Sequence, residues 1–134
     1  MFNLTTHKQS DHLIAILSFQ GNLDHLTYRE LINQANELYT NGYRNLVLDM
    51  RGIPNLGLSG TFALYSAATV FSGDIPLDPA GGLKALRAMA DKVVSKPTPH
   101  FKLLRPQPAV KNALSQSGLS VYDDMESVLT SIAC

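Results

Sequence analysis

Apolar residues follow two patterns along this chain: short continuous runs, and stripes at helical spacing. Apolar-rich runs at 13–19, 46–48 and 101–104 predict strands, and weaker patterns at 2–9 and 121–122 predict two more. The run at 46–48 contains no polar residue, which is typical of a strand covered on both faces, as in a parallel sheet. The first two strands follow one another without a helical pattern between them, so we expect them to pair antiparallel.

The first helical stripe follows the turn at Gly21-Asn22 and ends at Asn41-Gly42, a pair typical of a left-handed helix exit. Either Asp24 caps this helix, or Thr27 and Glu30 form a capping box. The stripe consists of Tyr28, Leu31, Ile32, Ala35, Leu38 and Tyr39.

A second stripe predicts a helix over 80–94, with Asp78 as its cap and Pro79 at its first position. We expect its apolar face to pack either on the domain or on a second copy of the chain. The second arrangement would form a homodimer. That face consists of Leu83, Leu86, Ala90 and Val93.

Two further helices are predicted near the end of the chain. One runs from Gln107-Pro108 through Ser117, with Gly118 as its stop and Leu119 packing back on Leu114. The other follows a capping box formed by Asp123 and Glu126. Its apolar stripe consists of Met125, Val128, Leu129 and Ile132.

These elements predict an α/β fold. Repeated strand–helix alternation indicates a mostly parallel sheet of four to five strands, with an N-terminal antiparallel strand and four or five helices. At 134 residues, the length fits a single domain over 1–134.

The candidate functional residues lie between the strand at 46–48 and the helical stretch of small and apolar residues that follows Gly57. Ser59 lies where the chain enters this helix, between Gly57 and Gly60, which leave its hydroxyl approachable. Unpaired N–H groups and the helix dipole favour a hydroxyl, carboxylate or phosphate at such a position. The ordinary alternative is an N-cap serine, which contributes about 1 kcal/mol.

Composition narrows the class of protein. Lys plus Arg and Asp plus Glu number 11 each, so a nucleic-acid interface, which needs a basic excess, is not expected. No apolar run approaches a membrane span, and no signal peptide is recognisable. The single cysteine, Cys134, excludes an internal disulfide and favours a cytoplasmic protein. The histidines show no metal-ligand spacing, and no cofactor motif is present.

Four segments together resemble the STAS domain, the fold of bacterial anti-sigma factor antagonists and of sulfate-transporter C-terminal domains. They are the turn at 21–24, the strand at 46–49, the helix start at 58–60 and the Arg105-Pro106 to Leu119 segment. The chain differs from the family's usual Asp-Ser-Ser-Gly by having Gly57-Leu58-Ser59-Gly60. It also has an insertion at about 72–100, longer than the family's connection.

The resemblance implies a non-catalytic regulatory module. Ser59 matches the serine that a partner kinase phosphorylates in the family's antagonists, and the partner is an anti-sigma factor or a histidine-kinase-like serine kinase. The implied partner-binding surface consists of Asp24, Asn55, Leu56, Gly57, Leu58, Ser59 and Gly60. A scaffold that works without phosphorylation, in a stress-signalling or transporter complex, is the alternative.

The least favoured alternative is a small serine hydrolase. The segment from Gly57 to Thr61 differs at one position from the Gly-x-Ser-x-Gly nucleophile elbow, because Thr61 replaces the second glycine. His100 is the one plausible downstream base, since the other histidines precede the serine.

Overall fold

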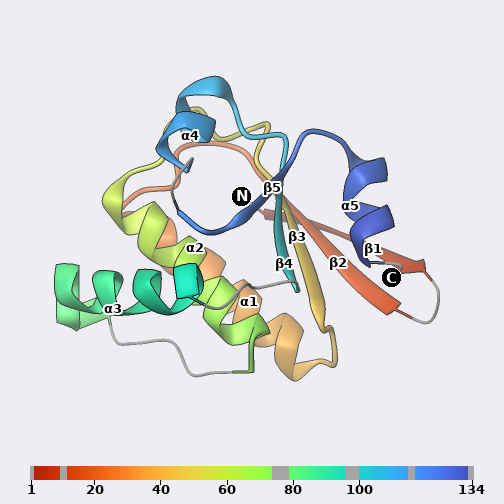
Figure 1. The fold of residues 1–134 in the computed structure, drawn as a ribbon, viewed down its shortest axis with the longest axis horizontal. Helices are drawn as coiled ribbons and strands as arrows, with labels where there is room; N and C mark the ends of the chain where they lie inside the picture. The colour runs from red at the N-terminus through yellow and green to blue at the C-terminus, as the bar shows by residue number, and fades with distance from the viewer. Residues whose placement is uncertain (1, 10–11, 74–78, 96–99, 115–116, 133–134) are drawn as a thin grey trace.

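The computed structural model describes residues 2–9, 12–73, 79–95, 100–114 and 117–132, so the predicted cap Asp78 lies outside the described residues. After an opening pair of strands, successive strands are connected through helices, with α2, η1 and α3 all between β3 and β4 (Figure 1). The strands are β1 (Phe2–Gln9), β2 (His12–Phe19), β3 (Asn45–Asp49), β4 (Phe101–Leu104) and β5 (Ser120–Tyr122). The helices are α1 (Tyr28–Thr40), α2 (Leu58–Phe71), the 3-10 turn η1 (Pro79–Gly81), α3 (Gly82–Ser95), α4 (Pro108–Ala113) and α5 (Met125–Ile132).

The five strands form one sheet in the order β1-β2-β3-β4-β5. β1 pairs antiparallel with β2, as expected, and β2 to β5 are mutually parallel. All five residues of β3 are buried, as its apolar run predicts for a central strand. The predicted fold class is therefore confirmed.

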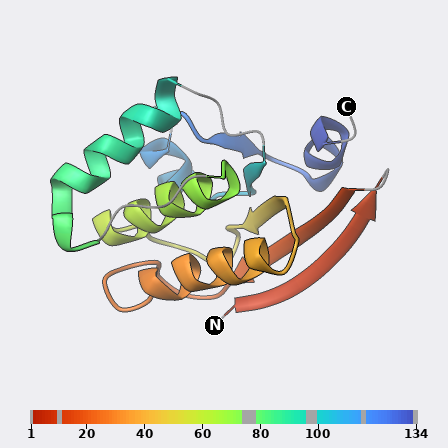
Figure 2. The same ribbon diagram turned by 90° about the horizontal axis from the view of Figure 1, so that it is seen from below.

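The two faces of the sheet are covered unequally. Alternate strand residues such as Leu17, Leu48 and Leu103 join the large core beneath α1, α2, α3 and α4. The opposite residues, including Val47 and Leu104, form a small second cluster with Val128 of α5. Figure 2 shows α1 to α3 together on one side of the sheet, with α5 separate from them.

α2 is buried along almost its whole length, from Phe62 to Phe71. α1 flanks it, with edge-to-face ring contacts between Tyr28 and Phe62 and between Tyr39 and Phe71. α3 packs on it from another side and brings the Met89 sulfur within 3.8 Å of the Ser66 hydroxyl. These neighbours explain why the sequence of α2 is apolar all round rather than striped.

The α3 helix packs on the domain, which is one of the two outcomes expected for it, but its buried face differs from the predicted one. Leu86 and Val93 are buried as expected, together with Met89, which the predicted stripe omitted. Leu83 was predicted to face inward and is 48% exposed. The helix begins at Gly82 after the 3-10 turn, and its burial starts only at Ala85, so the first apolar position stays at the surface.

Several predicted helix ends are shifted. Thr27 is the N-cap residue of α1 and makes no side-chain capping bond, so the predicted box with Glu30 does not form. Asp24 caps the turn just before the helix, because its carboxylate accepts the Leu26 N–H. The exit at Asn41-Gly42 is confirmed, and Gly42 has a φ of 101°. α4 ends at Ala113 rather than at Ser117.

At α5 the cap is Asp124, not the predicted Asp123. The Oδ1 atom of Asp124 accepts the Ser127 N–H at 2.7 Å, while Asp123 pairs with Lys111.

In the part of the chain that the structure describes, every helix is too short or too polar to cross a membrane.

A buried tyrosine ties α2 to the segment before β5. The Tyr65 hydroxyl donates a hydrogen bond of 2.9 Å to the carbonyl of Ser117, and burial raises the pKa of this tyrosine above its ordinary value. We expect Tyr65→Phe to lower the free energy of unfolding by about 1–2 kcal/mol, because a buried carbonyl loses its donor. Tyr28→Phe, which removes a hydroxyl whose partner among the described residues is the exposed Arg29, is the matched control.

The pKa of Tyr65 also gives a pH signature. Its hydroxyl ionises more readily in the unfolded chain, whose pKa is near 10.0. The stability from keeping it neutral is therefore fully present below pH 10 and is lost as the pH rises toward the higher folded pKa. Urea unfolding between about pH 7 and 11 should show the gap between the wild type and Tyr65→Phe narrowing above about pH 10. A constant gap would contradict this assignment.

Candidate functional site

The candidate site is built on two loops that pair side by side at the carboxyl end of the sheet. One follows β2 and the other follows β3. Gly21 N–H donates to Gly52 O at 2.9 Å, and Gly57 N–H donates to Leu23 O at 3.2 Å. A parallel bridge joins Leu23 and Leu56 between these two bonds. The pairing places Asp24 beside Gly57 at the start of α2, so these two predicted partner-binding residues lie next to each other.

Gly60 allows this close approach. A Cβ atom at position 60 would overlap the carbonyl oxygen of Leu23 and lie 2.8 Å from Cδ1 of Leu56. The first turn of α2 therefore packs directly on the backbone of the neighbouring loop. Gly60 is buried, so its contribution to the site is steric and it offers no surface to a partner.

Ser59 is the second residue of α2, and the N-cap residue is Gly57. The alternative interpretation of Ser59 as a capping serine is therefore wrong, since no side chain caps this helix. Ser59 is half-buried, and its hydroxyl makes no hydrogen bond to any described residue. The first bond within the helix runs from Thr61 N–H to Gly57 O, so the N–H groups of residues 58–60 lack a helical acceptor.

Asp24 is held by its own loop. Its Oδ1 accepts the Leu26 N–H at 2.9 Å, and the Thr27 hydroxyl lies 3.4 Å from the same oxygen. Thr27 in turn donates to the carbonyl of Asn22 at 2.8 Å. The Asp24 carboxylate therefore has a fixed orientation next to Gly57, where a Cβ atom would lie 3.9 Å from Cβ of Asp24.

The other predicted partner-binding residues differ in exposure. Asn55 and Gly57 are exposed, Leu56 is half-buried, and Leu58 is 63% exposed. An amide contact of 3.4 Å joins Asn55 to Asn22 across the two loops. The exposed apolar side chain of Leu58 thus lies at the beginning of an otherwise buried helix.

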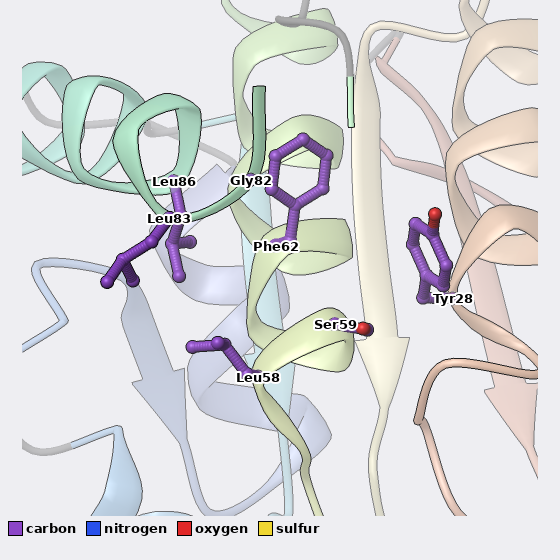
Figure 3. A pocket seen from close by; sticks show the side chains of 7 residues that line it. All are labelled: Tyr28, Leu58, Ser59, Phe62, Gly82, Leu83 and Leu86. Atoms are coloured by element: carbon purple, nitrogen blue, oxygen red, sulfur yellow. The ribbon is translucent and has the colours of Figure 1, made fainter. Parts of the chain in front are cut away.

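A pocket of about 110 Å³ opens beside Ser59, where α1, α2 and α3 all begin (Figure 3). We call it the helix-start pocket. Its lining residues are Tyr28 from α1, Leu58, Ser59 and Phe62 from α2, and Gly82, Leu83 and Leu86 from α3. In Figure 3 the Ser59 hydroxyl points to the side on which Tyr28 lies, and Leu58 points to the side of α3. The lining is mainly apolar, with the two hydroxyls as its polar groups.

Sequence reasoning did not identify Tyr28, Leu83 and Leu86 as part of the site. Both leucines were assigned to the buried face of the predicted helix over 80–94, and Tyr28 to the core stripe of α1. The sequence signal that could have identified the two leucines was the number of apolar positions in α3, because the helix has more of them than its contact with α2 buries.

The topology separates the two residues of the hydrolase alternative. His100 precedes β4, and its Nδ1 lies 3.1 Å from Oδ1 of Asn45 at the start of β3. Ser59 lies beyond the other end of β3, after the loop that follows Asp49. Because His100 and Ser59 lie at opposite ends of a parallel strand, His100 cannot act as the base for Ser59. Among the described residues, no three His, Cys, Asp or Glu side chains are grouped as metal ligands would be.

The family comparison decides the classification. The STAS domain model matches residues 4–72, which end at the last turn of α2. The chain belongs to the STAS domain family. The comparison with curated proteins gave no match.

Solved structures show the same fold. A Thermotoga maritima protein described as a putative anti-sigma factor antagonist is 14% identical with a TM-score of 0.67, covering 98% of this chain and 95% of that chain. An anti-sigma factor antagonist from Mycobacterium paratuberculosis is 17% identical with a TM-score of 0.59, covering 100% and 96%. The anti-sigma factor antagonist SpoIIAA, in its unphosphorylated form, is 14% identical with a TM-score of 0.51, covering 93% and 92%.

The close packing at Gly60 gives a direct test of how the STAS site is held. We expect Gly60→Ala to lower the free energy of unfolding by about 2–3 kcal/mol, because the new methyl group meets backbone that cannot move aside. Gly57→Ser is the matched control, since position 57 has room for a side chain and serine is a good N-cap residue. Urea unfolding of both variants measures the difference. If the Gly60→Ala variant were as stable as the wild type, the loops would not be packed as described.

Proposed function

We propose that this STAS domain is a non-catalytic regulatory module of the anti-sigma factor antagonist type. Its docking surface would be formed by the start of α2 and the two paired loops, with Asp24, Asn55, Leu56, Gly57, Leu58 and Ser59 around it. Phosphorylation of Ser59 would control docking. The chain from residue 72 to 100 would be an insertion in a single domain that spans 1–134.

The observation that carries this proposal is the state of Ser59. Its hydroxyl has no hydrogen bond to a described residue, it follows a glycine N-cap, and it lies among N–H groups without helical acceptors. A phosphate there adds about −1.5 to −2 charge where the helix dipole stabilises it. The fold should therefore tolerate the phosphate, and the main effect of phosphorylation should be on the affinity for a partner that binds this surface.

The partner would be an anti-sigma factor or a serine kinase, acting in the cytoplasm. Three solved relatives in fold are described as anti-sigma factor antagonists, one of them in an unphosphorylated form. Docking on a surface centred on Leu58 and Ser59 would bury the hydroxyl. A dianion at that position would then have to lose its water, which is costly.

We predict opposite effects for two variants of Ser59. Ser59→Asp should fold normally but lose at least tenfold in affinity for the partner, about 1.4 kcal/mol. Ser59→Ala should bind like the wild type and resist phosphorylation. Asn33→Asp, which adds the same charge on the exposed side of α1, is the control and should bind normally. Pull-down from the source cell identifies the partner, and calorimetry with the purified partner measures affinity.

Phosphopeptide mass spectrometry on the protein from its own cells tests the modification separately. If Ser59 is never modified and Ser59→Asp binds as tightly as the wild type, the phosphorylation switch is wrong. Recovery of transporter or stress-complex subunits in the same pull-down would then identify a scaffold that works without phosphorylation.

A further inference from the structure

We propose that the helix-start pocket receives one apolar side chain from a partner segment whose flanking residues are acidic. This inference deepens the proposed docking role of the surface and rests on it. It adds the chemistry of the partner and assigns helix α3 a part in recognition. Two independent features carry it: the apolar lining of the pocket and the basic residues around it.

The lining suits one branched aliphatic side chain. Phe62 and Leu86 are buried and form its deeper part, whereas Leu58 and Leu83 are 63% and 48% exposed. An apolar cavity of about 150 Å³ holds a benzene molecule, so about 110 Å³ accommodates one branched aliphatic side chain. Covering the two exposed leucines at the same time would remove apolar surface from water.

The rim of the pocket is basic on two sides. On the α1 side, Arg29 lies over the Tyr28 ring at 5.5 Å and donates from Nε to the Tyr28 hydroxyl oxygen at 3.0 Å. On the α3 side, the exposed residue Arg87 is one helical turn from Leu83, and the exposed residue Lys84 follows Leu83 in the sequence. None of these three cations forms an ion pair with a described residue.

Two carboxylates lie near these cations, Asp24 on the loop after β2 and the exposed Glu30 beside Arg29 in the first turn of α1. The carboxylate of Asp24 lies on the loop side, where Leu26 N–H already bonds to it. The starts of α1, α2 and α3 all line the pocket, and each contributes the positive end of a helix dipole. An acidic segment is therefore attracted, whereas a basic segment would meet three cations of like charge.

The rim also gives the proposed switch an electrostatic basis. A phosphate on Ser59 would lie in the lining of the pocket itself. It would neutralise part of the positive potential and repel acidic residues beside the apolar anchor. Phosphorylation should therefore weaken the binding of an acidic partner more than the binding of a neutral one.

A peptide selection on the purified, unphosphorylated chain tests the inference. The probe is a phage-displayed library of random peptides of about 16 residues, selected on the wild type and counter-selected on Leu83→Arg. Leu83 is exposed enough for this change to leave the fold intact, which thermal melting followed by circular dichroism checks. Ala88→Arg places the same charge on an exposed position of α3 outside the pocket lining and is the matched control.

We expect the enriched peptides to share one Leu, Ile or Met with Asp or Glu on either side. Fluorescence anisotropy should show at least tenfold weaker binding to Leu83→Arg, about fivefold weaker binding to Arg87→Glu, and no loss of binding to Ala88→Arg. Arg87→Lys should bind nearly as well as the wild type. Amide shifts in NMR spectra should map to residues 58–62 and 82–87.

Enrichment of basic or uncharged peptides, equal binding to Leu83→Arg, or no enrichment at all would overturn the inference. The result is independent of phosphorylation. A chain that binds acidic peptides in the pocket while its Ser59 variants behave alike toward the cellular partner would contradict the proposed switch and leave the pocket assignment standing.

Discussion

The site depends on backbone-to-backbone packing between the loops that follow β2 and β3. Two glycines permit it. A Cβ atom at Gly52 would overlap the carbonyl oxygen of Phe19, and one at Gly60 would overlap that of Leu23. Between them the loops exchange hydrogen bonds and form the Leu23–Leu56 bridge. Because α2 begins immediately after this contact, the position of Ser59 is fixed by main chain rather than by the packing of long side chains.

The burial of α2 is the second constraint, and it explains why α3 is present. A helix that is apolar on every side must be covered on every side. The sheet and α1 cover part of it, and α3 covers more through Leu86, Met89 and Val93. The α3 helix is thus part of the core of this domain. Its first turn extends past the covered region, and for that reason Leu83 is left beside Leu58 at the surface.

The sequence predicted the fold well because its signals are local and repeated. The apolar run at 46–48 and the stripes of α1 and α3 depend on periodicity, which many residues determine together. Errors of one or two residues arose where a single contact decides. Asp124 caps α5, while Asp123 forms an ion pair with Lys111. Two aspartates in a row look alike in the sequence, so the pattern could not show which of them would be the cap. Ser59 lies beyond the cap, inside the first turn, because the loop pairing ends at Gly57.

The helix-start pocket could not have been predicted in the same way, because it needs three helices to begin at one place. Tyr28, Ser59 and Gly82 are separated by long stretches of sequence, and no periodicity relates them. Its individual residues were visible, but each had a simpler explanation as core, cap or turn.

Asp24 lies on the neighbouring loop beside the start of α2. Position 57 carries no side chain, and a Cβ atom there would lie 3.9 Å from Cβ of Asp24, whose carboxylate accepts the Leu26 N–H. A second carboxylate at position 57 would lie against the first, and like charges at that distance repel each other. A single fixed carboxylate on the neighbouring loop leaves the start of α2 without a capping side chain. The N–H groups there remain available to an acceptor that arrives from outside the domain.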